Sequence, residues 1–202
     1  MISDRRLARF RQILERRQLD LEVVLDNIYD AHNASAVVRT SDGFGVGAVN
    51  LLYTEEAFPD ISKGVSGHVR KWTTFHDHTD AATCVETLHA RGLEVVATRV
   101  DPAASSHLEI DWTQPIALAL GNEQRGCTAE LIAAADRAIA IPMQGMAQSF
   151  NVSVAAAVVL GEAFRQRQAA GRYAASWSDE KEAILRAWLE REEPWEDPPG
   201  PK

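Results

Sequence analysis

Apolar residues occur along the chain in short runs separated by amphipathic segments, and the lengths of these runs predict the order of strands and helices. Runs typical of buried strands lie at residues 21–28, 48–53, 72–75, 93–100, 115–120 and 138–141. Helical spacing of apolar positions occurs at residues 3–18, 33–41, 79–91 and 127–135, and a long helix begins near residue 151. Strands that alternate with helices predict an α/β fold with a mostly parallel sheet flanked by helices.

The stretch from residue 138 to residue 160 carries more polar groups than its secondary structure requires. An apolar run of strand length stops at Pro142, because proline has no amide hydrogen to donate. Ser149, Asn151 and Ser153 then place three hydrogen-bonding side chains where one would cap a helix. Periodicity alone fits a plain strand, loop and core helix equally well. The surplus of polar groups favours a ligand site at the carboxyl end of the strand.

Length and composition indicate one domain with terminal additions and a cytoplasmic protein. The chain has 202 residues, of which 46% are hydrophobic, and this is ample for a core. Its two cysteines, Cys84 and Cys127, are not in a metal-like spacing, so we expect reduced thiols. The first residues are charged and contain no apolar signal segment, and no apolar run is long enough to cross a bilayer.

The charge distribution is uneven. The net charge of -8 argues mildly against a nucleic-acid partner, but the acidic residues collect near the C-terminus. The first helix is rich in arginine, at Arg5, Arg6, Arg9, Arg11, Arg16 and Arg17. Such a run is often only a solvated helix face. Because arginine matches the geometry of phosphate, a polyanionic partner is the alternative that we favour.

Two further patterns resemble ligand sites at first sight. The glycines of residues 42–47 suggest a dinucleotide-binding loop, but that motif needs a strand before the glycines and a helix after them. Here the order is reversed, so the glycines are better explained by a helix C-cap and a tight turn. His76 and His78 alternate at a strand end without a third ligand, which predicts exposed residues and no metal site.

Three segments together carry a family resemblance. Residues 33–39 read NASAVVR, residues 120–126 read LGNEQRG, and residues 141–153 read IPMQGMAQSFNVS. In this order they resemble the three motifs of the SpoU/TrmH family of the SPOUT superfamily, which span most of residues 21–165. Phe150 departs from the family pattern, in which leucine is usual, but it still supplies an apolar contact.

The resemblance implies a fold and an activity. The fold is a sheet with a deep C-terminal trefoil knot, an exception to the rule that chains do not thread loops. The activity is S-adenosylmethionine-dependent methylation of a ribose 2'-hydroxyl in RNA by a homodimer. The helical extensions at both ends are similar to those of the enzymes that act on guanosine 18 of tRNA. The alternatives are another tRNA position, ribosomal RNA, or a non-catalytic RNA-binding protein of this fold.

The same resemblance assigns roles to residues. The catalytic candidates are Arg39, Asn33, Glu123, Ser149 and Asn151. The candidates for binding S-adenosylmethionine are Thr98, Leu120, Gly121, Ile141, Met143 and Phe150. Arg39 is expected to act either as a base or as an electrostatic and phosphate anchor. In the simpler alternative, Asn33 only caps a helix and Glu123 only accepts hydrogen bonds from loop amides.

The implied organisation has three parts. Residues 1–19 are a basic helix that contacts tRNA, residues 20–168 are the methyltransferase domain, and residues 169–202 are a helical extension with a disordered acidic tail. The expected RNA-binding residues are Arg6, Arg9, Arg11, Arg17, Lys63 and Arg70. The tryptophans near the C-terminus are expected to pack on the body of the protein or on a second subunit.

Overall fold

A computed structural model describes residues 3–55, 57–59, 69–101 and 104–190. The chain divides into two compact units. We call residues 17–173 the sheet unit, and residues 3–16 together with 174–190 the helical unit. Among the described residues, no helix is long and apolar enough to cross a membrane.

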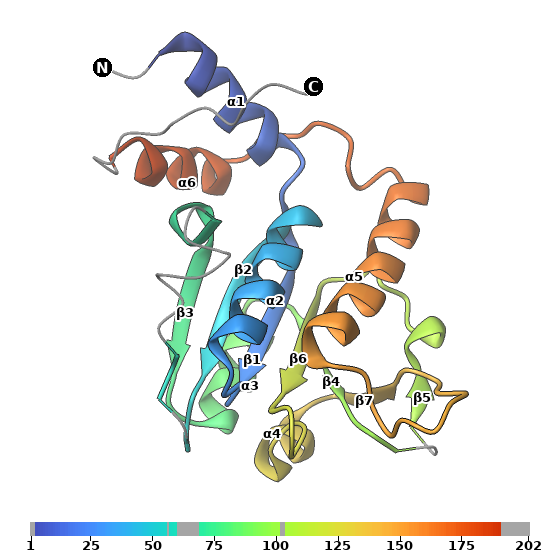
Figure 1. Ribbon diagram of the computed structural model, residues 1–202. Helices are drawn as coiled ribbons and strands as arrows, with labels where there is room; N and C mark the ends of the chain where they lie inside the picture. The colour runs from blue at the N-terminus through green and yellow to red at the C-terminus, as the bar shows by residue number, and fades with distance from the viewer. Residues whose placement is uncertain (1–2, 56, 60–68, 102–103, 191–202) are drawn as a thin grey trace. The chain divides into compact units, whose positions relative to one another are not determined.

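The sheet unit is built on parallel strands. Its sheet has seven strands in the order β3-β2-β1-β6-β4-β7-β5 (Figure 1). The strands are β1 (Gln18–Asp26), β2 (Val46–Leu52), β3 (Thr74–His78), β4 (Glu94–Thr98), β5 (Ser105–Ser106), β6 (Ile116–Gly121) and β7 (Arg137–Ala140). Every pairing is parallel, which confirms the predicted fold class. The trefoil knot stays a prediction.

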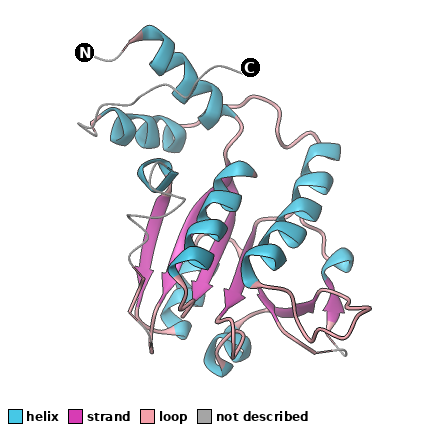
Figure 2. Cartoon of the chain, viewed as in Figure 1, coloured by secondary structure: helices cyan, strands magenta, loops and turns pink. Residues whose placement is uncertain are grey.

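Helices cover both faces of this sheet, as Figure 2 shows. One face carries α2 (Ala31–Gly43) and α5 (Val152–Ala169), which pack against each other, and the other face carries α3 (Ala81–Ala90) and α4 (Ala129–Ala134). Val23 and Leu25 of β1 belong to the core under α2 and α5, whereas Val24 belongs to the core under α3. Because successive strand residues point to opposite faces, the central strands β1, β2, β4 and β6 contribute to both cores.

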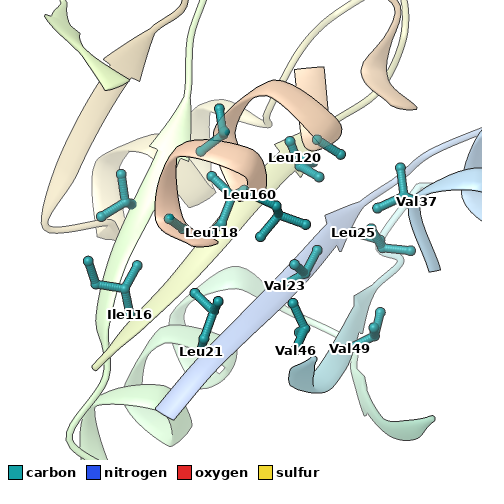
Figure 3. Packing of buried hydrophobic residues seen from close by; sticks show 14 of the residues in the cluster. Leu21, Val23, Leu25, Val37, Val46, Val49, Ile116, Leu118, Leu120 and Leu160 are labelled. Carbon is teal, nitrogen blue, oxygen red and sulfur yellow. The ribbon is translucent and has the colours of Figure 1, made fainter. Parts of the chain in front are cut away.

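The larger core lies between the sheet and the helices α2 and α5. Side chains from β1, β2, β6 and both helices meet there, among them Leu118 of β6, Val37 of α2 and Leu160 of α5 (Figure 3). Each of these three is completely buried, and a buried side chain of this size contributes about 1.5 to 3 kcal/mol. This core fixes both helices on one face of the sheet.

Two buried polar networks were not predicted. The side chain of Arg167, at the end of α5, is completely buried and donates to the carbonyls of Trp112 and Gln114. It also donates to Asp20 Oδ1 at 2.6 Å. On the opposite face, the buried carboxylate of Glu22 accepts hydrogen bonds from Arg91 and, at 2.8 Å, from Asn50. These bonds satisfy charges that would otherwise be costly to bury.

The element order was predicted well, and the differences are local. Residues 101–111 were expected to be a loop, but they contain β5, which pairs with β7, and a short 3-10 helix (η2, His107–Glu109). The expected strand at residues 72–75 begins at Thr74 instead, after a 3-10 helix (η1, Val69–Trp72). A pair of serines has no apolar pattern, so no periodicity argument identifies β5.

The helical unit contains α1 (Asp4–Glu15) and α6 (Asp179–Leu189). The rings of Phe10 and Trp188 meet edge to face at a centroid distance of 5.4 Å, so Trp188 packs within this unit. Lys181 donates a hydrogen bond from Nζ to the carbonyl of Glu15 at 3.0 Å. Trp195 and the acidic tail lie outside the described residues.

Candidate active site

The ends of three neighbouring strands bring the predicted cofactor residues to one edge of the sheet. β6, β4 and β7 lie side by side and run parallel, so their carboxyl ends share an edge. Thr98 ends β4, Gly121 ends β6, and Ile141 follows β7 directly. The hydroxyl of Thr98 donates to the carbonyl of Ala119 at 2.9 Å, which ties the end of β4 to β6. Leu120, beside Gly121, is completely buried.

The fold of the loop after β6 requires glycine at position 121. A Cβ atom at this position would overlap the backbone of Gly126 and Cys127, because the loop after β6 folds back over the end of the strand. That loop closes through paired backbone hydrogen bonds between Asn122 and Gly126, of 3.0 and 2.8 Å. The sequence pattern predicts glycine here for close approach of a ligand, and the closed loop supplies a separate reason.

The loop after β7 has unusually few internal bonds. Residues 142–150 make no hydrogen bond within the described part of the chain, and nearly all of them are exposed. Ile141 packs against the larger core, Met143 is partly exposed, and the side chain of Phe150 is 41% exposed. The loop therefore offers unpaired main-chain donors and acceptors beside apolar side chains, a combination that suits a ligand with an adenine ring.

Glu123 is the centre of a hydrogen-bond cluster. Its carboxylate accepts from the backbone amides of Tyr29 and Asp30, at 3.2 and 3.3 Å, and from Asn33 Nδ2 at 2.8 Å. The simpler expectation, that Glu123 accepts hydrogen bonds from loop amides, is thus correct in geometry. The third bond joins Glu123 to a second catalytic candidate, so the loop after β6 and the start of α2 are held together.

Asn33 and Asn151 continue this cluster. Asn151 Nδ2 donates to Asn33 Oδ1 at 3.0 Å, while Asn151 Oδ1 accepts from the amide of Ser153 at 2.9 Å and caps α5. The alternative that Asn33 caps α2 is wrong, because α2 begins two residues earlier and Asp30 is its N-cap. Residues from all three motifs therefore form one connected chain of side chains.

Arg39 and Ser149 are exposed and unengaged. Arg39 lies on α2, and neither residue makes a hydrogen bond or ion pair within the part of the chain that is described. Most arginines of the sheet unit whose side chains are described have a carboxylate partner, so an exposed guanidinium without one is available to a ligand. Both residues are therefore accessible from solvent, as a catalytic group must be.

The expected RNA-binding residues have different environments. Arg9 is exposed and, among the described residues, donates only to Gln12 within its helix, at 2.9 Å. Arg6 lies over the ring of Phe10, and Arg11 lies over the ring of Trp177. Lys63 lies outside the described residues, as does the side chain of Arg70.

Arg17 requires a correction. It was expected to contact RNA, but its side chain is buried and donates to Asp42 Oδ1 at 3.0 Å and to the carbonyl of Val46 at 3.2 Å. An arginine buried in this way serves the fold, because breaking its pair would leave an uncompensated charge. We therefore remove it from the RNA-binding set.

Two residues that support the site were missed. Asn122 is buried, donates to the carbonyl of Asn27 at 2.7 Å and accepts from the amide of Gln124, so it orients the loop that carries Glu123. Asp26, at the end of β1, accepts from the amide and hydroxyl of Thr128 at 2.6 and 2.9 Å, and burial raises its pKa. The available signal was a carboxylate directly after the apolar residues Val23, Val24 and Leu25.

The histidines and cysteines have structural surroundings. His78 Nε2 lies 3.0 Å from Asn50 Oδ1, and burial lowers the pKa of this histidine. Cys84 and Cys127 are buried free thiols, and burial raises the pKa of each to about 12. Over the described ranges, no three His, Cys, Asp or Glu side chains are arranged to hold a metal.

The fold and the linked loops define a SpoU-type methyltransferase. The chain belongs to the SpoU rRNA Methylase family, whose family model matches residues 20–161. It is 40% identical over 191 residues to the tRNA (guanosine(18)-2'-O)-methyltransferase of Thermus thermophilus, and this match covers 94% of the chain and 98% of that protein.

Two solved structures have the same fold. The TrmH/SpoU tRNA modifying enzyme of A. aeolicus is 39% identical, with a TM-score of 0.85, over 92% of this chain and 95% of that one. An AdoMet-bound rRNA methyltransferase from Sinorhizobium meliloti is 28% identical, with a TM-score of 0.64, over 77% of this chain and 59% of that one. The second structure shows that a relative of this fold binds S-adenosylmethionine.

Proposed function

We propose that the protein transfers a methyl group from S-adenosylmethionine to the ribose 2'-hydroxyl of guanosine 18 in tRNA. The observation that carries this proposal is the hydrogen-bonded chain from Glu123 through Asn33 to Asn151, which links all three family motifs. The choice of tRNA is supported by coverage, because this chain spans 98% of the tRNA guanosine-18 enzyme of Thermus thermophilus but only 59% of the rRNA enzyme.

The edge of the sheet fits S-adenosylmethionine. Met143 and Phe150 supply apolar surface for its adenine ring, while Leu120 is completely buried and supports the end of β6. The unpaired main-chain groups of residues 142–150 are available to the ring's polar edge. Thr98 and Gly121 border the same edge. When bound, the cofactor supplies a methyl group that is already activated by its positive sulfur, so the protein has little covalent chemistry to perform.

The protein's own residues must align the ribose and stabilise its charge. As the ribose oxygen bonds to the methyl carbon, the carbon–sulfur bond breaks, sulfur keeps the electron pair, and the hydroxyl proton leaves to solvent or to a substrate phosphate oxygen. Arg39 binds a phosphate of the substrate and stabilises the negative charge that develops on the ribose oxygen, because arginine normally keeps its positive charge. Glu123 is already bonded to Asn33 and two amides, so it acts as a positioning residue.

Ser149 and Asn151 complete the set of proposed site residues. Asn151 fixes the end of the cofactor loop, because it caps α5 and bonds to Asn33. Ser149 precedes it by two residues, and we expect its exposed hydroxyl to contact the ribose or the cofactor. Precise alignment of the two reacting atoms supplies a large part of the rate enhancement in such a reaction.

The proposed assembly is a cytoplasmic homodimer that binds tRNA through the helical unit. Val154 on α5 is 45% exposed, and this apolar side chain supports contact with a second copy. Residues 1–19 carry the arginine-rich helix, in which Arg6, Arg9 and Arg11 are the proposed phosphate contacts, with Lys63 and Arg70 from the connection before β3.

The test is tritiated methyl transfer to unmodified tRNA, followed by mapping of the methylated ribose. We expect one methyl group at guanosine 18, and we expect Arg39→Ala to lower kcat by roughly 100- to 1,000-fold, the usual loss when one charge-stabilising donor is removed. Methylation of ribosomal RNA instead would favour the rRNA alternative, and binding of RNA without transfer would favour the non-catalytic one. Calorimetry with S-adenosylmethionine tests the cofactor independently of the RNA.

A further inference from the structure

An open depression lies beside the start of α2, next to the catalytic candidates. It has a volume of about 600 Å³ and is lined by Tyr29, Asp30, Ala31, Ala57, Phe58 and Pro59. Glu123 connects it to the site, since one carboxylate holds the amides of Tyr29 and Asp30 as well as the side chain of Asn33. A ligand in the depression would therefore lie beside the residues that are proposed to position the ribose.

Tyr29 is more exposed than the fold requires. Its side chain is 71% exposed and makes no hydrogen bond or ring contact within the described residues. Its backbone is nevertheless fixed, because its amide donates to Glu123 Oε2 at 3.2 Å. An aromatic ring held out on a fixed backbone is a platform on which a nucleobase can stack.

The wall of the depression that Phe58 forms is supported by a neighbouring aromatic residue. Phe58 packs edge to face on Tyr53 at a centroid distance of 5.1 Å, and the hydroxyl of Tyr53 donates to the carbonyl of Ile28 at 3.1 Å. Ile28 is completely buried in the larger core. The wall is therefore preorganised, which reduces the cost of ordering when a flat ring binds.

Asp30 gives the depression a chemical preference. It is exposed, and its Oδ1 accepts from the amide of His32 at 2.8 Å, so the carboxylate is held in place. An ionised carboxylate only accepts hydrogen bonds. The Watson–Crick edge of guanine presents two neighbouring donors, N1–H and the N2 amino group, whereas adenine presents an acceptor at N1. A carboxylate on this rim therefore favours guanine.

We propose that this depression binds the guanine base of the nucleotide that is methylated, with Tyr29 stacking on the ring and Asp30 accepting from N1–H and the N2 amino group. This rests on the proposed function. It deepens that function by naming the residues that select the base.

Two substitutions at Tyr29 test the stacking contact. Tyr29→Ala is expected to lower kcat/KM for tRNA by about 5- to 150-fold, the usual effect of removing one aromatic ring from a stacked base. Tyr29→Phe keeps the ring and is expected to stay within about twofold of the unaltered protein, because stacking needs no hydroxyl. Leu108→Ala removes another large apolar side chain, 58% exposed, and is the matched control with expected normal activity.

Inosine at position 18 tests base selection, because inosine lacks the N2 amino group. The unaltered protein is expected to have a kcat/KM roughly 10- to 150-fold higher for the guanosine tRNA than for the inosine tRNA, the effect of one hydrogen bond to a charged group. Asp30→Asn keeps the helix cap, since asparagine caps as well as aspartate, but it should bring this preference close to one. Binding of S-adenosylmethionine, measured by calorimetry, should be unchanged in every variant.

The outcomes separate the two proposals. If the unaltered protein methylates tRNA but Tyr29→Ala is equally active, or Asp30→Asn keeps the full preference for guanosine, the base site is wrong and the activity stands. If the unaltered protein methylates neither the tRNA with guanosine at position 18 nor the tRNA with inosine there, both proposals are overturned.

Discussion

Asn151 donates a hydrogen bond of 3.0 Å to Asn33, across 118 residues of sequence. It joins the start of α5 to the first turn of α2, and Glu123 bonds to the other end of the Asn33 amide group. Since Asn33 both accepts from Asn151 and donates to Glu123, its amide orientation is fixed by its two neighbours. A change at either neighbour will therefore affect the other.

The first prediction concerns this pair. Asn33→Ala and Asn151→Ala should each lower kcat/KM for tRNA, but their combined effect should differ from the sum by about 0.5 to 3 kcal/mol, because the residues are in contact. A double-mutant cycle on methyl transfer measures this coupling. Asn151→Ser is the matched control, because serine also caps α5 but cannot reach Asn33 with an amide. Simple additivity would show that the bond has no role in the reaction.

The second prediction concerns Arg9. Its side chain is exposed, and its one hydrogen bond to a described residue lies within its own helix, so Arg9→Ala should leave the melting temperature unchanged. It should weaken tRNA binding and reduce the salt slope of log K by about 0.7 to 0.9, as expected for one lost phosphate contact. Filter binding over a series of salt concentrations measures both. An unchanged affinity and slope would exclude Arg9 from the RNA interface.

The third prediction separates two arginines of α5. Arg167→Ala removes a completely buried guanidinium and leaves several carbonyls and Asp20 without their donor. We expect a loss of about 3 kcal/mol in the free energy of unfolding, at the low end for a buried pair because Asp20 is partly exposed. Arg165→Ala removes an ion pair whose arginine side is 68% exposed, and it should cost at most about 1 kcal/mol. Chemical denaturation compares them, and equal losses would contradict this assignment.

The fourth prediction concerns the thiols. Burial raises the pKa of Cys84 and Cys127 from 9.0 to about 12, so both stay protonated in the folded protein where the unfolded chain ionises. Their contribution to stability should therefore be complete below about pH 9 and be lost between about pH 9 and pH 12. Labelling with a thiol reagent at pH 8 should be slow in the native state and fast in denaturant. Rapid native labelling would contradict their burial.

Strand and helix order followed from the sequence because most elements have strong apolar periodicity. β6 is a continuous apolar run, as expected when a strand is covered on both faces, and the run of residues 21–25 in β1 is interrupted only by Glu22. β5 was not predicted, because it consists of two serines that have no apolar pattern. The order of the strands in the sheet could not be predicted from the sequence, because only tertiary packing decides that β6 lies between β1 and β4.

The candidate site was predictable to a different extent. Sequence motifs brought Asn33, Glu123 and Asn151 to attention, and the structure places them in one hydrogen-bonded chain. The motifs gave no sign of the direction of each bond, which depends on how the chain places each amide group. Arg17 was misjudged because an arginine at the end of a basic helix looks solvated, while its partner Asp42 is 25 residues away in sequence.

The closed loop over Gly121 bears on how mutagenesis of this protein should be interpreted. Alanine at this position would drive its methyl group into the main chain of Gly126 and Cys127, so the turn would have to open. Loss of activity in Gly121→Ala would then reflect a misfolded turn. A crystal structure or limited proteolysis, rather than kinetics, would reveal this misfolding. Only substitutions at side chains that do not hold the backbone in place offer an unambiguous probe of that edge.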